Sequence, residues 1–578
     1  MQKITLFFLV LFSQTIFSAT KITETEKLVA TCKVWGFLKY YHPKVASGQL
    51  DWDKQLLEKL PKIEKAETKE DFSLIIENWI DELGPIKEVA PIVASKEVDY
   101  FDKNFDLSWF NNSQVFSKKL SQKLKFIEQN RFQGDQFYVY GSEHVGNVGM
   151  RNESFDHPNF TDKNSKLRMV FMFWNLVEYF FPYKYLMDQK WDTTLENIIP
   201  LAIQAENQAD FYKVMKKLAC KTDDSHTEVY TYPSASSTAN SKPSNYFPAT
   251  GKIIDEKLVV TEILADSLAQ ADDIKVGDVI TKVNGETVKE FIAKYRDLTS
   301  ASNEAKFLDK IAPGMLVSKS DTIKVEFLKN GKYITKTMIW HDYHDSHRNE
   351  FKKGARKKKE KFKLLDNNIG YVDMGILTGK NVPDMIEKLK DTKAIVFDLR
   401  NYPKGTIEDI AKFISPKENK FAIYTVPDLN YPGRFKWNNE GTSCGIENKD
   451  HYKGKVIVLV NEETQSHAEW TAMAFQSMGN ATIIGSQTSG ADGNISVFDF
   501  KGFRTLFSGI GVYYPDKGET QRIGIVPNIE IKPTIKGIQE GRDEVLDRAL
   551  FFIEAGDLKT GATTNPKVNL KEIPSLKN

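Results

Sequence analysis

From residue 368 onward, short apolar strand patterns alternate with helical patterns, and this alternation restricts the possible fold more than any other feature of the sequence. Four segments have the length and composition of buried strands: 369–374, 394–400, 456–460 and 481–485. Three segments carry apolar residues at helical spacing: 382–389, 407–414 and 468–478. Strands that alternate with helices predict an α/β layer with mostly parallel strands. Because ligands of such sheets lie beyond the carboxyl ends of the strands, we expect functional residues there.

The first part of the chain contains an internal repeat. Segments 27–43 and 166–182 share Lys, Leu, Trp, an aromatic pair and a final Pro at the same offsets. Each copy continues with a Trp-Asp pair, at 52–53 and 191–192, and then with a second helical pattern. Apolar residues recur at intervals of three and four, so both copies predict helical hairpins in which the Pro stops the first helix.

The two copies differ where they end. The first ends at Asp81-Glu-Leu-Gly84, whereas the second ends with Asp223-Asp-Ser-His-Thr227 and runs into the strand-like segment 228–232. Between the copies, roughly 87–160 mixes short strand-like pieces with Asn, Gly and Asp, which predicts an irregular or β-rich insertion. We therefore expect an N-terminal helical repeat domain over residues 20–235.

A linker rich in Ser, Asn, Thr, Pro and Ala follows at 234–244. Beyond it, a strand, a small helix and a second strand lead into Asn284-Gly285, a pair that suits a hairpin turn with positive φ. This order and the phrase Gly-Asp-Val-Ile…Val-Asn-Gly resemble a PDZ domain over 245–345. The resemblance implies that a peptide adds a strand to a sheet edge, although a purely structural module remains an alternative.

Ser466 lies near the point where the strand 456–460 gives way to the helix 468–478. A serine at such a turn projects its hydroxyl beyond the sheet, while the amides after it in the chain point toward a developing oxyanion. Taken alone, the same residue would also suit the N-cap of the helix. Its neighbours favour the catalytic interpretation.

These neighbours resemble the C-terminal-processing and tricorn-type serine peptidases, which carry a strand, Asn-Glu and a Thr-Ala-Ser-Ala-Ser-Glu-like turn before a helix. The corresponding residues here are Asn461-Glu462 and Thr464-Gln-Ser-His-Ala-Glu469. The resemblance implies that Ser466 is the nucleophile and that residues 365–555 form a ClpP/crotonase-like α/β catalytic domain.

Two further phrases extend the resemblance. Asp398-Leu-Arg-Asn-Tyr-Pro-Lys-Gly405 is similar to the family loop that lends an oxyanion donor, which implies this role for the backbone of Gly405. The amide of His467 is the natural second donor because it is next to the nucleophile in the chain. Gly524-Ile-Val-Pro-Asn-Ile-Glu530 is similar to the family's Gly-x-x-Pro-Asp phrase.

The departures from the family pattern concern the general base. Members with a Ser–Lys dyad carry a lysine where this chain has Thr488-Ser-Gly-Ala491, so that base is absent. A serine hydroxyl needs a partner that takes its proton. The tricorn-type branch uses a His preceded by a Ser or Gly, which implies His226 as the base and Ser225 as an orienting residue. A histidine also has a suitable pKa for this task.

The fourth catalytic member is less well matched. The tricorn-type branch has a Glu before its Gly-x-x-Pro phrase, and the equivalents here are Glu519 and Gln521. The offset from Gly524 favours Gln521, which can orient groups by hydrogen bonds but carries no negative charge. His467 is a rival base by proximity to Ser466, although adjacent residues have difficulty aiming at one another.

Composition and residue spacing give little reason to expect a nucleic-acid partner or a metal site. A formal net charge of +1 gives no reason to expect a nucleic acid, and the basic run 352–359 is interpreted as a solvated loop. Cys32, Cys220 and Cys444 form no metal pattern, although one disulfide is conceivable. His341, His344 and His347 recur every three residues, but a solvated linker is favoured over a metal site. No metal or organic cofactor is expected.

The N-terminus predicts an export signal over residues 1–19, with Lys3, an apolar stretch and the small residues Ser18-Ala19. We expect a periplasmic or extracellular protein with no integral membrane span after cleavage, and a C-terminal tail over 556–578. The whole pattern predicts a serine endopeptidase that acts on peptides or unfolded protein. A peptide-binding protein without turnover and an esterase or amidase remain alternatives.

Overall fold

The computed structural model describes residues 21–89, 92–93, 95–153, 159–231, 245–318, 320–339, 341–342, 360–500 and 502–555. The predicted signal 1–19, the tail 556–578 and the side chains of the 341–347 histidines lie outside this part of the chain. The chain divides into two compact units, one of residues 1–93 with 106–133 and one of residues 94–105 with 134–578.

The first unit contains the first copy of the repeat. Its helices are α1 (Glu24–Tyr41), α2 (Pro43–Ala46), α3 (Trp52–Glu64), α4 (Lys69–Glu82) and α5 (Lys118–Gln129). The Trp35 and Trp52 indoles each donate to the other residue's carbonyl oxygen, at 3.3 and 3.0 Å. Helix α5 belongs to the insertion, where composition had suggested irregular or β structure. Its buried residues Leu120, Leu124 and Ile127 have helical spacing.

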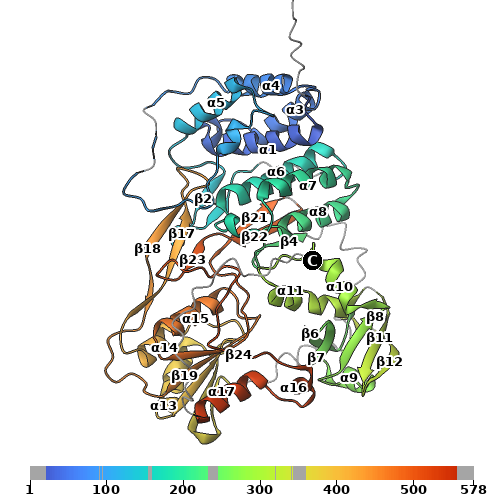
Figure 1. Cartoon of the computed structure of the whole chain (residues 1–578), viewed down its shortest axis with the longest axis vertical. Helices are drawn as coiled ribbons and strands as arrows, with labels where there is room; N and C mark the ends of the chain where they lie inside the picture. Colours follow the sequence, from blue (N-terminus) through green and yellow to red (C-terminus); the bar gives the residue numbers. More distant parts are fainter. Residues whose placement is uncertain are drawn as a thin grey trace, which may run out of the picture. The chain divides into compact units, whose positions relative to one another are not determined.

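The second unit begins its helical part with the second copy. Its helices are α6 (Lys163–Phe180), α7 (Trp191–Gln204) and α8 (Gln208–Cys220), which lie together in Figure 1. Trp174 and Trp191 repeat the mutual indole-to-carbonyl bonds, both at 3.0 Å. The predicted helices are thus present in both copies. Among the described residues, no helix has the length and apolar character that a membrane span requires.

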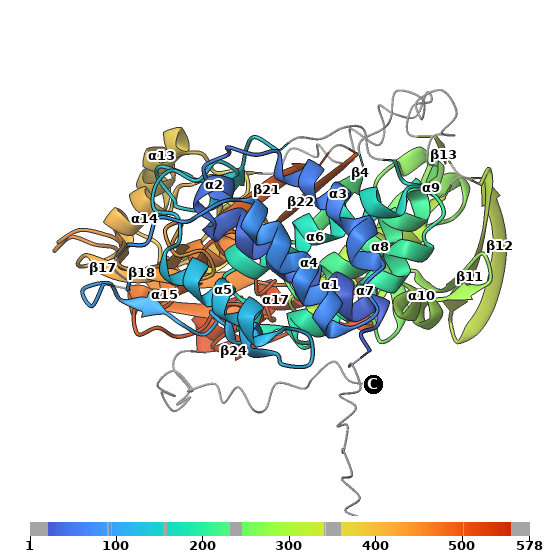
Figure 2. The same ribbon diagram turned by 90° about the horizontal axis from the view of Figure 1, so that it is seen from above.

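Residues 245–339 form the predicted PDZ-like sheet, in the order β12-β11-β8-β7-β6. The strands are β6 (Ala249–Ile254), β7 (Lys257–Ile263), β8 (Val279–Val283), β11 (Thr322–Lys329) and β12 (Lys332–Ile339). Asn284 and Gly285 have φ values of 52° and 87°, as the predicted turn requires. Figure 2 shows β11 and β12 as a long hairpin. Helices α9 (Asp266–Ala271), α10 (Val288–Tyr295) and α11 (Glu304–Ile311) complete the region.

The main sheet of the C-terminal region has the order β14-β15-β16-β19-β20-β24. Its strands are β14 (Phe362–Leu365), β15 (Ile369–Asp373), β16 (Ala394–Asp398), β19 (Lys455–Val460), β20 (Ala481–Gly485) and β24 (Ile529–Glu530). From β15 to β24 all neighbours are parallel, and only β14 is antiparallel. The predicted α/β layer is confirmed.

Helices cover both faces of this sheet because its strand residues alternate in direction. Ile395 and Phe397 join a core with α13 (Val382–Leu389), α14 (Ile407–Ile414) and α15 (His467–Ser477). Ala394 and Val396 join the opposite core with α17 (Glu544–Ala555). Figure 1 shows α15 and α17 on either side of these strands.

Two smaller sheets flank the site. One has the order β1-β18-β17-β23, with β1 (Tyr100–Phe101), β17 (Asn419–Pro427), β18 (Phe435–Cys444) and β23 (Gly511–Tyr513). The other has the order β21-β22-β4, with β21 (Ile495–Phe500), β22 (Phe503–Ser508) and β4 (Glu228–Thr231). Strand β4 comes directly after the second copy of the repeat and therefore joins that copy to the C-terminal region.

Candidate active site

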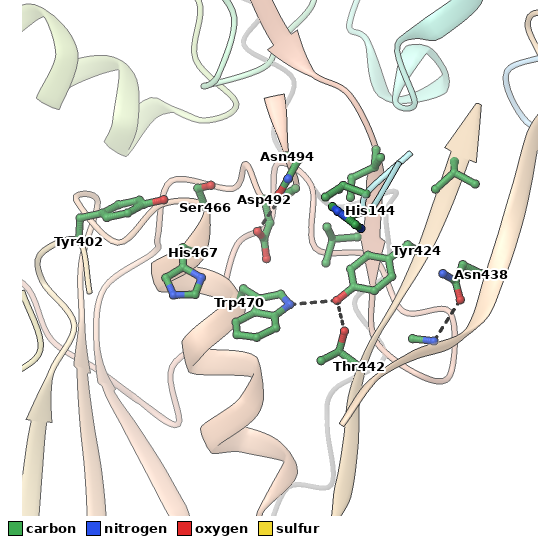
Figure 3. A pocket seen from close by; sticks show the side chains of 16 residues that line it. His144, Tyr402, Tyr424, Asn438, Thr442, Ser466, His467, Trp470, Asp492 and Asn494 are labelled. Carbon is green, nitrogen blue, oxygen red and sulfur yellow. Dashed lines mark hydrogen bonds between the residues drawn. The ribbon is translucent and has the colours of Figure 1, made fainter. Parts of the chain in front are cut away.

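Ser466 occupies the predicted turn between β19 and α15. Its φ of 57° and ψ of −124° are strained for a residue with a side chain. The Ser466 amide donates to the carbonyl oxygen of Ala491 at 2.9 Å and to Glu469 Oε2 at 3.3 Å, which hold this conformation. Ser466 lines a cavity of about 460 Å³ (Figure 3).

Gly405 and His467, the predicted oxyanion donors, lie beside this turn. Gly405 has a φ of +69°, and a Cβ at its position would lie 4.0 Å from Nε2 of His467. The His467 ring stacks on Trp470 with a centroid distance of 5.2 Å. Among the described residues no hydrogen bond joins the His467 imidazole to Ser466. Burial lowers the pKa of His467.

His226, the predicted base, is buried and forms a hydrogen-bonded chain with two residues that the sequence did not single out. Its Nδ1 lies 2.9 Å from Oγ of Ser508, and that hydroxyl donates to Oδ1 of Asp224 at 3.0 Å. Because the single hydroxyl proton of Ser508 is donated to Asp224, the Ser508 oxygen accepts a hydrogen bond from Nδ1 of His226. Nδ1 therefore carries the proton, and Nε2 is the acceptor nitrogen.

Asp224 is the centre of this chain. Its carboxylate accepts from the amides of His226 (3.2 Å) and Ser508 (2.9 Å), and from Thr227 Oγ1 (3.1 Å). Desolvation by burial lowers the pKa of His226, the Asp224 carboxylate opposes this shift, and Lys310 and Lys306 add to it. The net direction favours the neutral imidazole, which is the form that a base needs.

Strand pairing brings this histidine from the repeat to the C-terminal region. Strands β4 and β22 are antiparallel with Leu506 opposite Glu228, and continuing this register sets Ser508 opposite His226. Ser225 Oγ donates to the Ser489 carbonyl at 3.0 Å, and the Ser489 amide donates to the Thr464 carbonyl at 3.0 Å. Ser489 therefore connects the segment that carries His226 with the turn that carries Ser466.

The two candidates for the fourth member lie in different places. Gln521 is buried, and its Nε2 donates to Oδ1 of Asp224 at 3.1 Å, so it belongs to the histidine cluster. Glu519 instead accepts from Tyr185 Oη and pairs with Lys103 at 2.8 Å. No hydrogen bond joins His226 to Ser466 among the described residues.

The segment that replaces the absent lysine is tied to a buried carboxyl group on α15. Glu469 accepts hydrogen bonds from Thr488 Oγ1 and from the amides of Gly490 (2.8 Å) and Ala491 (3.0 Å). Desolvation by burial raises the pKa of Glu469. These hydrogen bonds therefore hold the segment in place beside Ser466.

One group of carboxylates in the described part of the chain is close enough to hold a metal ion: Asp309, Glu462 and Glu463. The Lys252 ammonium lies 2.6 Å from Glu462 and 2.9 Å from Glu463. An internal cation therefore already compensates these charges. The three cysteines are buried and form no disulfide in the described part of the chain.

Sequence reasoning missed Asp224 and Ser508. Asp224 lay within the quoted Asp-Asp-Ser-His phrase, so a search for acceptors near His226 could have found it. Ser508 carries no local signal, because it is one serine at the end of a β-strand and lies 282 residues from its partner.

Comparison with known proteins identifies the two C-terminal regions. Residues 368–531 match Peptidase family S41, and residues 236–302 match the PDZ domain. The "Carboxy-terminal processing protease CtpA" of Bacillus subtilis is 25% identical over 352 residues, which cover 57% of this chain and 64% of that protein. The "Carboxyl-terminal-processing protease" of Synechocystis sp. is 26% identical over 170 residues, 28% of this chain and 37% of that one.

The chain thus spans less than two thirds of the length of these relatives. A solved structure, mature CPAF complexed with lactacystin, has a TM-score of 0.53 at 13% identity and covers 68% of this chain and 99% of its own. At this identity the likeness shows a shared fold. The multidomain α/β fold and the family resemblance are confirmed: one region of the chain matches peptidase family S41, and a region before it matches the PDZ domain.

Proposed function

We propose that this chain is a serine peptidase in which Ser466 is the nucleophile and His226 is the base. Ser466 Oγ attacks the peptide carbonyl carbon, and its proton passes to Nε2 of His226. The amides near Gly405 and His467 stabilise the oxyanion. When the C–N bond breaks, His226 returns the proton to the leaving amine, and water then hydrolyses the acyl-enzyme by the same route.

One observation carries this proposal. The chain from His226 through Ser508 to Asp224 assigns the proton to Nδ1 and leaves Nε2 as the acceptor, which is the tautomer that a general base needs. A histidine that served only to fill the core would not require a buried carboxylate to orient it through a hydroxyl. Gln521, which donates to Asp224, is proposed to steady this carboxylate, and Ser225 to position the segment.

The proposed substrate is a peptide or an unfolded protein. The relatives named as carboxyl-terminal-processing proteases and the PDZ domain support a chain end as the recognised feature. The predicted signal over 1–19 supports export to the periplasm or the cell exterior. N-terminal sequencing of the protein from that compartment tests this expectation, and retention of residues 1–19 in the cytoplasm would contradict it.

A peptide-binding protein without turnover is the second candidate. It is favoured by the lack of a hydrogen bond between His226 and Ser466 among the described residues, and by an amide, Gln521, where the tricorn-type branch has a Glu. Such a protein would bind peptides but would not react with compounds that modify a catalytic serine.

A serine-reactive phosphonate probe separates the two. We expect labelling of the wild-type chain that is lost in Ser466→Ala and in His226→Ala, with Ser477→Ala and His451→Ala as matched controls that keep it. Because burial lowers the pKa of His226, the labelling rate should fall only below the ordinary histidine range. Labelling that persists in Ser466→Ala removes Ser466 from the mechanism, and a wild type that never reacts favours the binding protein.

A further inference from the structure

The cavity beside Ser466 contains a buried carboxyl group that the proposed mechanism does not use. Asp492 lines this cavity and is only 4% exposed. Figure 3 shows its carboxyl group turned toward the space between Ser466 and Trp470. Its Oδ1 accepts from the Gly493 amide at 2.6 Å, whereas Oδ2 is buried and has no partner in the described part of the chain.

An unpartnered buried carboxyl oxygen is costly unless a ligand satisfies it. None of the described residues that line the cavity is a lysine or an arginine, and its basic lining residues are the two histidines His144 and His467. Glu469 lies nearby as a second buried carboxyl group. Desolvation and, second, the charge of Glu469 raise the pKa of Asp492. In the empty cavity these effects favour the protonated carboxyl group, and a bound cation would instead favour its ionised form.

The other walls of the cavity suit an extended cationic side chain. Tyr424 and Trp470 present aromatic rings, and the Trp470 indole donates to Tyr424 Oη at 3.0 Å, which fixes both. Aromatic faces attract ammonium and guanidinium groups. Val426 and Val512 supply apolar surface for the methylene stem of such a side chain. A volume of about 460 Å³ accommodates a lysine or arginine side chain.

We propose that Asp492 makes this cavity a binding site for a basic substrate side chain, lysine or arginine, next to the bond that Ser466 attacks. The inference rests on the proposed function for the position of the scissile bond. The cation site itself requires only the cavity, the aromatic walls and the unpartnered carboxyl oxygen.

Two phosphonate probes test the preference on the full chain, one with a lysine-like and one with a leucine-like side chain at the reacting residue. We expect the lysine-like probe to label Ser466 at least about tenfold faster. Asp492→Asn keeps the hydrogen bond from Gly493 and should bring this ratio near one, mainly by slowing the lysine-like probe. Asp409→Asn, on the exposed side of α14, serves as the matched control. A leucine preference in the wild type, or an unchanged ratio in Asp492→Asn, overturns the inference.

Equilibrium binding of benzamidine to Ser466→Ala separates this inference from the proposed function. Its planar amidinium can pair with a carboxyl group and stack on an aromatic ring. We expect saturable binding that Asp492→Asn weakens by about tenfold or more. If neither probe labels the wild type but benzamidine binds through Asp492, the peptidase proposal fails and the cation site stands. If benzamidine does not bind, or binds equally to Asp492→Asn, the cation site is wrong.

Discussion

The two copies of the helical repeat use the same internal contacts but have different ends. In the first, Lys27 Nζ donates to the carbonyls of Glu64 (2.6 Å) and Ala66 (2.8 Å). In the second, Lys166 donates to Ile203 (3.0 Å) and Ala205, at the same sequence offsets. The tryptophan pair is also repeated. The same lysine and tryptophan contacts therefore stabilise both copies.

The copies diverge beyond this shared scaffold. The first ends its last helix, α4, in a short turn, whereas the second leads into Asp224, His226 and strand β4. Where the first has His42 after α1, the second has Phe181 after α6, and the Phe181 ring packs on Phe507 of β22 at 5.7 Å. The first copy thus contains none of the candidate catalytic residues, while the second carries the candidate base. Function resides in a few residues at the end of an element whose fold they do not determine.

The largest expected difference between the copies is in activity. Asp224→Asn should slow phosphonate labelling of Ser466 by about 10²–10⁴-fold, because an amide in place of the carboxylate no longer fixes the direction of the Ser508 hydroxyl and, through it, the tautomer of His226. The matched change at the end of the first copy, Asp81→Asn, should leave the rate unchanged. Labelling kinetics with intact protein mass detection measure both. An equal loss in the two variants would show that the copies do not differ in function.

The shared lysine should stabilise both copies alike. Lys27→Met and Lys166→Met each remove two charge-assisted hydrogen bonds to helix-end carbonyls, which we expect to cost about 2–4 kcal/mol of local stability. Hydrogen exchange of amides in α1 and α6 reports the two losses separately. A large loss of local stability in only one copy would show that the lysine does not stabilise the two copies equally.

His42, the C-cap residue of α1, predicts that the stability of the first copy, but not of the second, depends on pH. His42 is buried with neither ring nitrogen partnered among the described residues, and burial, with Lys44, lowers its pKa to about 4. Between pH 6.5 and 4 the unfolded chain binds a proton that the folded chain does not, so stability falls as the pH falls. At pH 5 the loss relative to pH 8 is about 2 kcal/mol.

His42→Phe, which copies the residue of the second repeat, should flatten this dependence. Hydrogen exchange of α1 at pH 5 and pH 8 measures it, with α6 as the internal reference. An unchanged slope in the variant would assign the pH dependence to other groups.

The smallest expected effect concerns the link between the second copy and the Ser466 turn. Ser225→Ala removes the bond to Ser489, and we expect a loss of about fivefold to twentyfold in labelling rate, of the size of one hydrogen bond. If Ser225 only positions the segment, Ser225→Thr should restore most of the rate and the pH profile should be unchanged. A loss as large as that of His226→Ala would instead give Ser225 a direct part in the reaction.

The sequence by itself determined the elements, the repeat and the peptidase-like motifs. Strand and helix patterns, the Asn284-Gly285 turn and the phrases around Gly405 and Ser466 are local, so their residues determine their own backbone. The phrase around His226 is local in the same way. It pointed to a histidine base because the family lysine is absent at 488–491. The helix α5 was missed because its three buried apolar residues lie within a polar insertion.

The tertiary structure alone decided which groups surround the histidine. Ser508 orients His226 because β4 pairs with β22, and Gln521 reaches Asp224 across 297 residues of sequence. The unpartnered oxygen of Asp492 is likewise a property of a cavity built from several strands and loops. Such contacts depend on strand register and long-range packing, which no short sequence pattern encodes.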